Sequence, residues 1–373
     1  MKRLVLVGGG HAQVEVLLRL GQTPVPDLDI VLVSPVADAP YSGMLPGLVA
    51  GRYSWGECHI DLASLARHAG ARLLPTRVVA INPVERQVMC ADRRVLTYDV
   101  LSLDIGSVPP IETVEGAAAH GVPVKPVDGF LDVWNALVQE ARDRTLRVIV
   151  VGGGAGGVEL ILAMRQRLLH ESGVAPRADF TVVTQGSGVL SEHPAGVRRR
   201  IVRALATKDV GVLANVRVVR VSAAGLTLEG GAEVPADCVI WATGAAAPAW
   251  LRTSGLALDD QGFVLVDDKL QSVSHPGLFA TGDVATMRDH PRPKSGVFAV
   301  RQGPPLAENL RLALADAPLK SYRPQRRSLS LISTGGRHAV ASWGGFAFQG
   351  AWVWHWKDAI DRKFMARYDL DPA

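Results

Sequence analysis

Apolar residues along this chain fall into short continuous runs that alternate with longer stretches of helical spacing. Residues 3–7 and 29–33 are runs rich in valine, leucine and isoleucine, and residues 12–20 between them place apolar side chains at helical spacing. Short continuous runs are typical of strands buried on both faces of a parallel sheet. The order strand, helix, strand predicts a βαβ unit at the start of the chain.

The same order recurs in the middle of the chain. Residues 147–151 and 179–183 are again strand-like runs, and residues 158–169 between them have helical spacing. The sequence therefore predicts an internal duplication of one βαβ unit.

In both units a glycine-rich turn joins the first strand to the helix. The first turn reads Gly8-Gly9-Gly10-His11-Ala12-Gln13, and the second reads Gly152-Gly153-Gly154-Ala155-Gly156-Gly157. Glycine lets the backbone approach a ligand closely, and the free N–H groups at the start of a helix bind phosphate. One such turn is a weak signal, but two turns in this context predict two nucleotide sites.

Three later strands also end in glycine. Residues 98–107 end in Gly106-Ser107, residues 236–244 end in Thr243-Gly244, and residues 277–283 end in Gly282-Asp283. At each end glycine allows a sharp turn or close passage past a ligand. The pattern predicts an α/β fold with two Rossmann-like dinucleotide-binding domains.

The last forty-odd residues differ from the rest. Short strands are expected at residues 328–332 and 338–342, followed by a tryptophan-rich helix at residues 351–366. Its four-residue spacing predicts one shared apolar face, made of Trp352, Trp356, Ile360 and Phe364. We expect a small C-terminal α+β cap whose helix suits a membrane surface, a dimer contact or packing over the first domain.

Composition narrows the functional classes. The chain has 373 residues, 48% hydrophobic and 20% charged, with a net charge of +4. We expect no nucleic acid partner, because no basic stripe belongs to a recognisable module. Three scattered cysteines, the absence of a signal peptide and the absence of a long apolar stretch predict a cytoplasmic protein that does not cross a membrane.

Taken together, these five ordered motifs resemble the pyridine nucleotide–disulfide oxidoreductase superfamily. The resemblance implies that the first glycine turn binds FAD and the second binds NADH or NADPH. It implies an FAD domain of residues 1–110 and 246–325, interrupted by an NAD(P) domain of residues 111–245, with the cap at residues 326–373. The implied activity is that of an FAD-dependent NAD(P)H oxidoreductase.

A finer resemblance covers nearly the whole chain. The segments 41–47, 58–62 and 293–303, with the tryptophan-rich tail, resemble a subgroup related to type II NADH:quinone oxidoreductases. Members of this subgroup are also found fused to selenophosphate synthetase, so that enzyme is an expected partner. A cytoplasmic protein of this kind could also contact the inner face of the membrane peripherally, through residues 351–366.

The resemblance also implies site residues. The expected FAD ligands are Gly8, Gly10, His11, Ser34, Tyr41, Pro46, Gly106, Gly282, Asp283, Gly296 and Val297. The expected NAD(P) ligands are Gly152, Gly154, Gly157, Glu159, Thr184 and Gly244. In this scheme the N–H groups of Gly10 and His11 hold the pyrophosphate and Asp283 holds the ribityl chain. The helix after Pro293 points its N-terminus at the flavin.

Three positions depart from the family pattern. Gln13 replaces the third glycine of the first turn, so we expect helix and strand to move apart slightly. Ser34 stands where a carboxylate would bind ribose, and Thr184-Gln185 offers neither that carboxylate nor an arginine for NADPH. Residues 198–200 are three arginines that could reach a 2′-phosphate or simply begin a solvated helix. The choice between NADH and NADPH stays open.

The electron acceptor is open as well, because residues 41–51 contain no cysteine pair. A quinone, a soluble oxidant or a partner protein would each serve. Cys58 beside His59 is either an activated thiolate or a small core residue. The first reading would make the protein a reductase of a selenium or sulfur species, and a third hypothesis is a non-catalytic redox sensor.

Two residues are candidates for catalysis. Lys294 is either a cation near the flavin or a surface lysine, and Glu159 either lies near the flavin and nicotinamide or stabilises the helix dipole. No metal site is expected.

Overall fold

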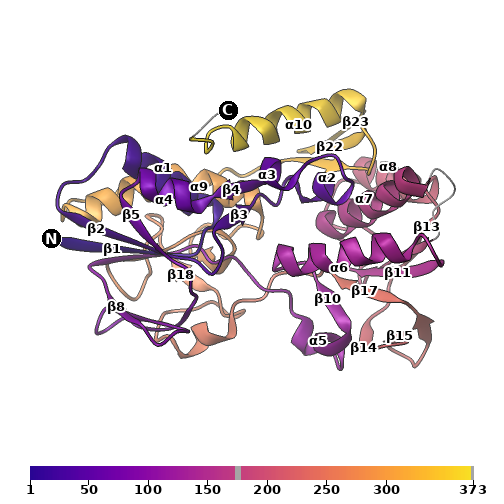
Figure 1. The fold of residues 1–373 in the computed structure, drawn as a ribbon, viewed down its shortest axis with the longest axis horizontal. Helices are drawn as coiled ribbons and strands as arrows, with labels where there is room; N and C mark the ends of the chain where they lie inside the picture. Colours follow the sequence, from indigo (N-terminus) through magenta and orange to yellow (C-terminus); the bar gives the residue numbers. More distant parts are fainter. Residues whose placement is uncertain (173–177, 371–373) are drawn as a thin grey trace.

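Two α/β lobes lie side by side in this computed structural model, which describes residues 1–172 and 178–370 (Figure 1). The first lobe contains a five-stranded parallel sheet of order β19-β9-β1-β2-β5. Its strands are β1 (Lys2–Val7), β2 (Leu28–Val33), β5 (Ala71–Leu74), β9 (Val100–Leu103) and β19 (Leu278–Ala280). Because β19 follows the whole second lobe in sequence, the chain leaves the first lobe and returns to complete its sheet.

The second lobe repeats this plan with a parallel sheet of order β10-β17-β11-β12-β13. Its strands are β10 (Gly121–Pro123), β11 (Leu146–Val151), β12 (Ala178–Val183), β13 (Val210–Leu213) and β17 (Cys238–Trp241). The two-domain Rossmann-like fold and the internal duplication are confirmed. The exact domain boundaries stay a prediction.

Each lobe also carries a three-stranded antiparallel meander that the sequence patterns did not reveal. The first comprises β6 (Val78–Asn82), β7 (Gln87–Cys90) and β8 (Val95–Thr97). The second comprises β14 (Val218–Ser222), β15 (Gly225–Leu228) and β16 (Glu233–Pro235). The duplication therefore extends beyond the βαβ units.

Helices cover the two sheets. The first lobe has α1 (His11–Gln22), α4 (Leu62–His68) and α9 (Gly296–Leu314), and the second has α6 (Val127–Glu140), α7 (Ala155–Ser172) and α8 (Ala195–Ala206). Helix α9 approaches α1 closely because Gly303 has no side chain, and a Cβ there would lie 2.7 Å from the Cβ of Glu15. Shorter elements connect them, namely β3 (Asp38–Pro40), α2 (Leu45–Val49), α3 (Trp55–Cys58), β4 (His59–Asp61), η1 (Ile111–Thr113), α5 (Ala117–His120), η2 (Ala249–Thr253), β18 (Val264–Val266), η3 (Gly282–Val284) and β20 (Ala285–Met287).

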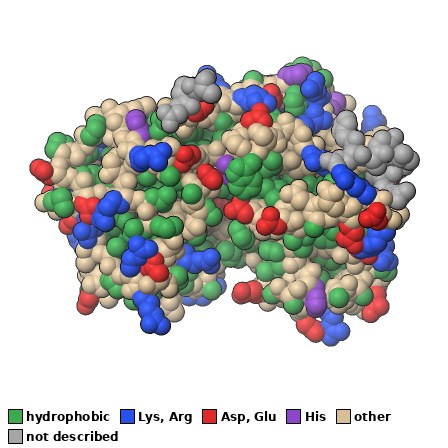
Figure 2. Space-filling model, viewed as in Figure 1, with side chains coloured by type: hydrophobic (Ala, Val, Ile, Leu, Met, Phe, Trp, Pro, Cys, Tyr) green, Lys and Arg blue, Asp and Glu red, His purple; other side chains and the backbone are tan. Residues whose placement is uncertain are grey.

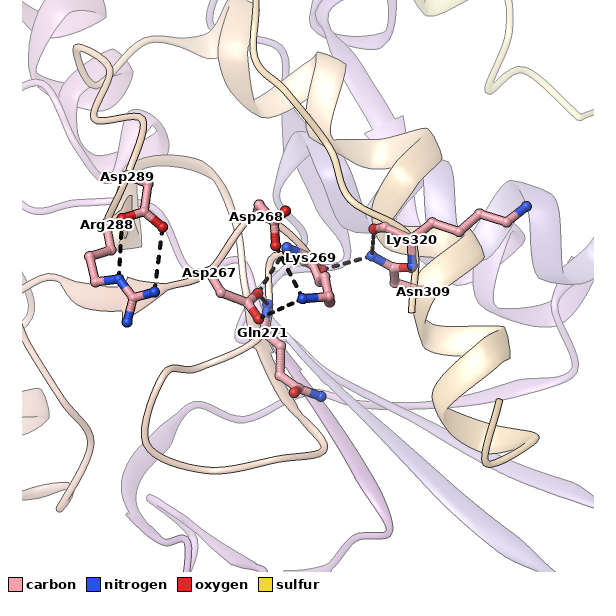
Figure 3. A network of polar contacts seen from close by, with 8 residues as sticks. All are labelled: Asp267, Asp268, Lys269, Gln271, Arg288, Asp289, Asn309 and Lys320. Atoms are coloured by element: carbon pink, nitrogen blue, oxygen red, sulfur yellow. Dashed lines mark hydrogen bonds and ion pairs between the residues drawn. The ribbon is translucent and has the colours of Figure 1, made fainter. Parts of the chain in front are cut away.

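A buried asparagine fixes α9 to the rest of its lobe (Figure 3). Asn309 is fully buried, and its Nδ2 donates to the carbonyl oxygens of Lys269 (2.8 Å) and Lys320 (2.9 Å). Its Oδ1 accepts from the Lys320 N–H at 2.8 Å. Every polar atom of this amide is therefore paired, which holds the helix in one position.

Two linkers cross between the lobes as an antiparallel pair. The N–H groups of Val108 and Ala246 each donate to the other residue's carbonyl, at 2.9 and 2.8 Å. Lys125 of the second lobe also pairs with Asp283 of the first at 3.3 Å. These contacts fix the angle at which the two expected nucleotide sites face each other.

The C-terminal segment forms the α+β cap predicted from the sequence. It consists of β21 (Leu329–Ser333), β22 (Ala339–Trp343), β23 (Phe346–Gly350) and α10 (Ala351–Met365), which runs across the top of both lobes in Figure 1. Strand β23 was not predicted.

The phase of α10 corrects one expectation. Trp352, Trp356 and Ile360 are 56%, 42% and 42% exposed, but Phe364 is only 8% exposed and stacks on Tyr41. Each four-residue step advances about 40° around a helix, so three steps turn Phe364 about 120° away from Trp352. Phe364 belongs to the core.

Candidate functional site

The first glycine turn lies at the carboxyl end of β1, between β2 and β9, where the strand order reverses. Ligands of open parallel sheets bind at this crevice. Gly8 has φ +95°, and any Cβ there would collide with the carbonyl of Asp104. Only glycine fits this position.

The residue after β9, Asp104, places its side chain at the start of α1. Sequence reasoning missed this residue. Its Oδ2 accepts hydrogen bonds from the N–H groups of Ala12 (2.8 Å) and Gln13 (3.2 Å). Its carbonyl oxygen accepts the N–H of Gly10 at 3.2 Å. Burial, with the nearby charge of Asp283, raises the pKa of the Asp104 carboxyl to about 7.

This arrangement corrects the expected phosphate contacts. Because the N–H of Gly10 is already bonded within the chain, only His11 of the expected pair keeps an N–H without a partner. Gln13 is fully buried, and its Nε2 donates to Ser102, at 2.8 Å to the carbonyl oxygen and 3.3 Å to Oγ. The amide is thus held by β9 where the family has glycine.

Several of the expected FAD ligands converge near His11. The ring centroids of His11 and Tyr41 are 5.4 Å apart. A Cβ on Gly296 would lie 3.3 Å from Ser42 Oγ and 3.8 Å from His11 Nε2. The His11 Nε2 is buried without a partner, and burial lowers the pKa of His11 to about 4. A buried, unpaired ring nitrogen fits a site that a polar ligand completes.

The start of α9 faces the same place. No side chain caps its N-terminus at Ser295, so the N–H groups of Gly296 and Val297 are available to a ligand. A helix start of this kind favours negative charge. Pro46, by contrast, is buried in α2 and supports the loop from beneath.

Asp283 lies in η3, which packs against this helix. Its Oδ2 accepts hydrogen bonds from Ser107 Oγ and Lys125 Nζ, both at 3.3 Å. Gly282 donates its N–H to Gln302 at 2.7 Å, and the space around Gly106 is open. These residues fit the hydroxylated chain of FAD, which would hydrogen-bond to Asp283.

Ser34 does not fit the role expected of it. The side chain is almost fully buried, and its hydroxyl donates to the Val36 carbonyl at 2.8 Å, which closes a turn. Because that hydroxyl already donates its hydrogen bond to Val36 and is buried, the adenosine ribose would need another partner.

The second glycine turn has the more regular geometry. A Cβ on Gly157 would collide with the carbonyl of Gly152, so the third glycine is required by packing. Gly154 and Gly244 face open space, and Thr184 lies against Gly153. The turn therefore fits a dinucleotide. Within residues 1–172 and 178–370, we find no carboxylate at the end of β12 placed to bind a ribose.

Glu159 reaches a polar cluster at the junction of both lobes and the cap. Its Oε1 accepts the Ser333 N–H at 2.7 Å, and burial raises the pKa of Glu159 to about 7, against the opposing effect of Lys357. Lys357 donates from Nζ to Asp361 Oδ2 and to the Gly43 carbonyl, both at 2.6 Å. Tyr41 donates its hydroxyl to Asp361 Oδ1 at 3.2 Å.

The cluster has two members that sequence reasoning missed, Lys357 and Asp361. Burial opposes the charge of Lys357, but Asp361 and Glu159 raise its pKa above the usual value. An i, i+4 pairing of lysine and aspartate on a helix is common on surfaces, so the sequence alone gave no reason to expect a buried pair. Their contact with the Tyr41–Gly43 loop places them beside the expected flavin site.

The other catalytic candidate, Lys294, is directed away from that cluster. Its Nζ donates to the Ala285 carbonyl (2.6 Å) and Thr286 Oγ1 (2.9 Å) and lies 3.9 Å from the centroid of the Phe263 ring. Burial lowers the pKa of Lys294 to about 8. This placement favours a role in holding the loop before α9.

No cysteine is suited to redox exchange. Cys58, Cys90 and Cys238 are all free and buried. Burial raises the pKa of Cys58 to about 12, so it is a thiol at neutral pH and matches the core-residue reading. Among the residues the structure describes, no cluster of His, Cys, Asp or Glu is arranged for a metal ion.

Residues 2–303 match the pyridine nucleotide-disulphide oxidoreductase family. The chain belongs to this family. Together with the two glycine turns, this membership confirms the expectation of an FAD-dependent oxidoreductase that uses NAD(P)H.

Individual relatives are similar over nearly their whole lengths. The chain is 26% identical to the demethylphylloquinone reductase of Synechocystis sp., with 93% of this chain and 88% of the relative covered. It is 29% identical to an NADH dehydrogenase-like protein of Mycobacterium tuberculosis, with 87% and 83% covered.

Solved structures share the fold. The sulfide:quinone oxidoreductase of Aquifex aeolicus superposes with a TM-score of 0.81 at 19% identity, covering 99% of this chain and 91% of that one. NDH2 from Plasmodium falciparum in complex with NADH also gives 0.81, at 15% identity, covering 98% and 97%.

Proposed function

We propose that this protein is an NAD(P)H:quinone oxidoreductase. The observation that carries the proposal is the buried Lys357–Asp361 pair beside the Tyr41–Gly43 loop, close enough to Glu159 for their charges to interact. Reduction of a quinone needs two electrons and two protons, and this cluster holds ionisable hydrogens where the acceptor would meet the flavin. Quinone reductases among the relatives support the same acceptor class.

FAD, when bound, supplies the electron chemistry by taking hydride from reduced nicotinamide and passing electrons to the acceptor. The chain's own residues bind and orient the partners. Asp283 and the start of α9 would hold the flavin, and the turn from Gly152 to Gly157 would hold the nicotinamide nucleotide. The Val108–Ala246 linker pair keeps the two halves aligned.

The polar cluster would supply and replace protons. With a pKa of about 7, Glu159 carries its proton over much of the neutral range and can release it without a large cost. Lys357 stays charged and attracts electron density on a nearby oxygen of the acceptor. Asp361 orients Lys357 through their 2.6 Å hydrogen bond.

Steady-state assays with a short-chain benzoquinone test this function. We expect NADH or NADPH oxidation that depends on the quinone and exceeds the rate with oxygen alone. A disulfide substrate such as dithionitrobenzoate serves as the control acceptor. Rapid turnover of the disulfide with none of the quinone would contradict the proposal.

We further propose that the cap contacts a membrane surface, where such quinones dissolve. Phe346, Phe348, Trp352 and Trp356 form a chain of exposed aromatic neighbours with ring centroids 6.3 to 6.4 Å apart. Exposed tryptophans on the amphipathic helix α10, next to the exposed phenylalanines of β23, suit the headgroup level of a bilayer. None of the described helices has the length and apolarity to cross a membrane.

The dimer alternative for residues 351–366 would bury the same aromatic side chains, and the selenophosphate synthetase partner stays a prediction. Reduction of a selenium or sulfur species through Cys58 is less well supported. That thiol is buried and its pKa is raised, both of which oppose thiolate chemistry.

A further inference from the structure

A second hollow lies outside the expected flavin and nicotinamide sites. It has a volume of about 800 Å³ and is lined by residues from the end of α2, helix α7, the β21–β22 turn and helix α10. Its lining includes Arg52, Arg167, Arg337 and Arg362, with Trp354 and Asp358. We refer to it as the arginine pocket.

Two of these arginines have no acidic partner. Arg362 is neutralised by Asp358 and Glu57, at 3.1 and 2.9 Å. Among the described residues, neither Arg52 nor Arg337 forms an ion pair, and Arg52 Nε is buried without a hydrogen-bond partner. The pocket therefore keeps positive charge that its own lining does not balance.

The fold holds these guanidinium groups close together despite their repulsion. The Cζ atoms of Arg52 and Arg337 lie 5.4 and 5.9 Å from the centroid of the Trp354 ring. Arg52 also donates to the Gly335 carbonyl at 3.3 Å. Burial lowers the pKa of Arg52, and so does the charge of Arg337, because the two guanidinium groups are close enough to repel each other.

The pocket is not part of either glycine turn. Arg167 lies twelve residues along α7 from Ala155, which is about 18 Å at 1.5 Å per residue. On the flavin side, the hydrogen bond of 2.6 Å between Tyr53 and Asp358 forms a wall of the pocket. A nucleotide in either expected site would not bring its pyrophosphate to Arg52 and Arg337.

We propose that the arginine pocket binds a phosphate group. Planar guanidinium groups bind phosphate oxygens in pairs, and an aromatic ring beside them keeps their planes ordered. The phosphate could belong to a soluble metabolite or to an anionic lipid headgroup. The second source is reachable because the exposed face of α10, with Trp352 and Trp356, adjoins the side of the helix that lines the pocket.

The test compares a double variant, Arg52→Gln with Arg337→Gln, against a control that removes the same charge elsewhere. Arg93→Gln with Arg217→Gln suits this purpose, because both residues are exposed and lie on the two meander regions. Calorimetric titration with inorganic phosphate and pyrophosphate, at constant ionic strength, measures the soluble arm. Co-sedimentation with phosphatidylcholine vesicles, with and without phosphatidylglycerol, measures the lipid arm.

We expect the holoprotein to bind phosphate or phosphatidylglycerol, and the double variant to bind about tenfold or more weakly. Calorimetric binding identifies a soluble ligand, and binding that needs phosphatidylglycerol identifies a headgroup. The proposal is overturned if neither probe binds, or if the control loses as much affinity as the double variant. If the double variant misfolds, Arg337→Gln alone replaces it, since Arg337 is exposed and makes no described hydrogen bond.

Discussion

At the scale of single residues, Asp104 is the least expected residue beside the proposed flavin site. It bonds three N–H groups at the start of α1, two through its carboxylate and one through its carbonyl. The position is the end of a strand at the reversal point of the sheet, and that location is the only signal in the sequence that could have pointed to it. A buried carboxyl beside Asp283 costs stability whenever it is ionised.

The pH dependence of unfolding tests this cost. The folded pKa of Asp104, about 7, lies above the unfolded value of 3.8, so the native state holds more protons between these values. Stability from this group is therefore lost as pH rises from about 4 to about 7, by roughly 4 kcal/mol in total. Asp104→Asn is expected to remove that loss, which urea unfolding at fixed flavin content would measure.

His11 changes the stability with pH in the opposite direction, so its contribution must be separated from that of Asp104. Its pKa falls from 6.5 to about 4, so its contribution to stability rises with pH over that window. The difference between Asp104→Asn and the parent protein cancels this effect. A difference in unfolding free energy that stays constant from pH 4 to pH 8 would contradict the burial account of Asp104.

Glu159 gives a kinetic prediction at the same scale. Below pH 7 its carboxyl carries the proton, so turnover with a quinone should fall as pH rises through about 7. Glu159→Gln should lower kcat about tenfold or more and abolish that pH step. Glu229→Gln, on an exposed turn of the second lobe, is the matched control. An unchanged pH profile in Glu159→Gln would exclude the residue from proton delivery.

At the scale of elements, the position of α9 depends on Asn309. The amide makes three hydrogen bonds to Lys269 and Lys320 and is completely buried. Asn309→Ala leaves those backbone groups unpaired and is expected to cost about 2–4 kcal/mol of unfolding free energy. Urea unfolding measures this, with Asn135→Ala on the exposed face of α6 as control. Equal stability of the two variants would contradict the assigned role.

The sequence predicted the repeated elements well and the contacts between distant elements poorly. Periodicity and glycine turns located β1, α1 and β2, and again β11, α7 and β12, because these features are local. The meanders and β23 are short, partly exposed strands without a strong periodic signal. Phe364 was placed on the wrong face because four-residue spacing drifts around a helix.

The same limit applies to the site. The glycines and Asp283 could be proposed as ligands from the sequence because their motifs are contiguous. Lys357 and Asp361 meet the Tyr41–Gly43 loop only through tertiary packing that spans up to 320 residues. Asp104 likewise reaches the start of α1 from 92 residues away in the sequence. Ser34 looked available as a ligand because its hydrogen bond to Val36 cannot be deduced from residue type alone.

At the scale of the whole molecule, the two lobes and the cap meet at one region. Figure 2 shows an indentation between the lobes, with hydrophobic side chains gathered near the middle of the face. The Glu159 cluster joins the second lobe, the cap and the first lobe through Ser333, Lys357 and Gly43.

The membrane proposal belongs to this scale. Trp352→Ser with Trp356→Ser removes two of the exposed rings without disturbing the buried side of α10. We expect co-sedimentation with liposomes to fall at least about fivefold, since each ring contributes roughly 1 kcal/mol or more of apolar burial. If sedimentation is unchanged and the protein is a dimer that these substitutions dissociate, the exposed aromatic residues of the cap form a subunit interface.

In the proposed reaction, electrons pass from a nicotinamide nucleotide through FAD to a quinone without a protein dithiol. Anaerobic stopped-flow spectroscopy of the purified holoprotein measures this most directly. We predict that NADH or NADPH bleaches the visible flavin absorbance, and that a short-chain quinone then restores it at least as fast as steady-state turnover. Failure of both nucleotides to bleach the flavin, or failure of the quinone to restore its colour, would rule out this path for the electrons.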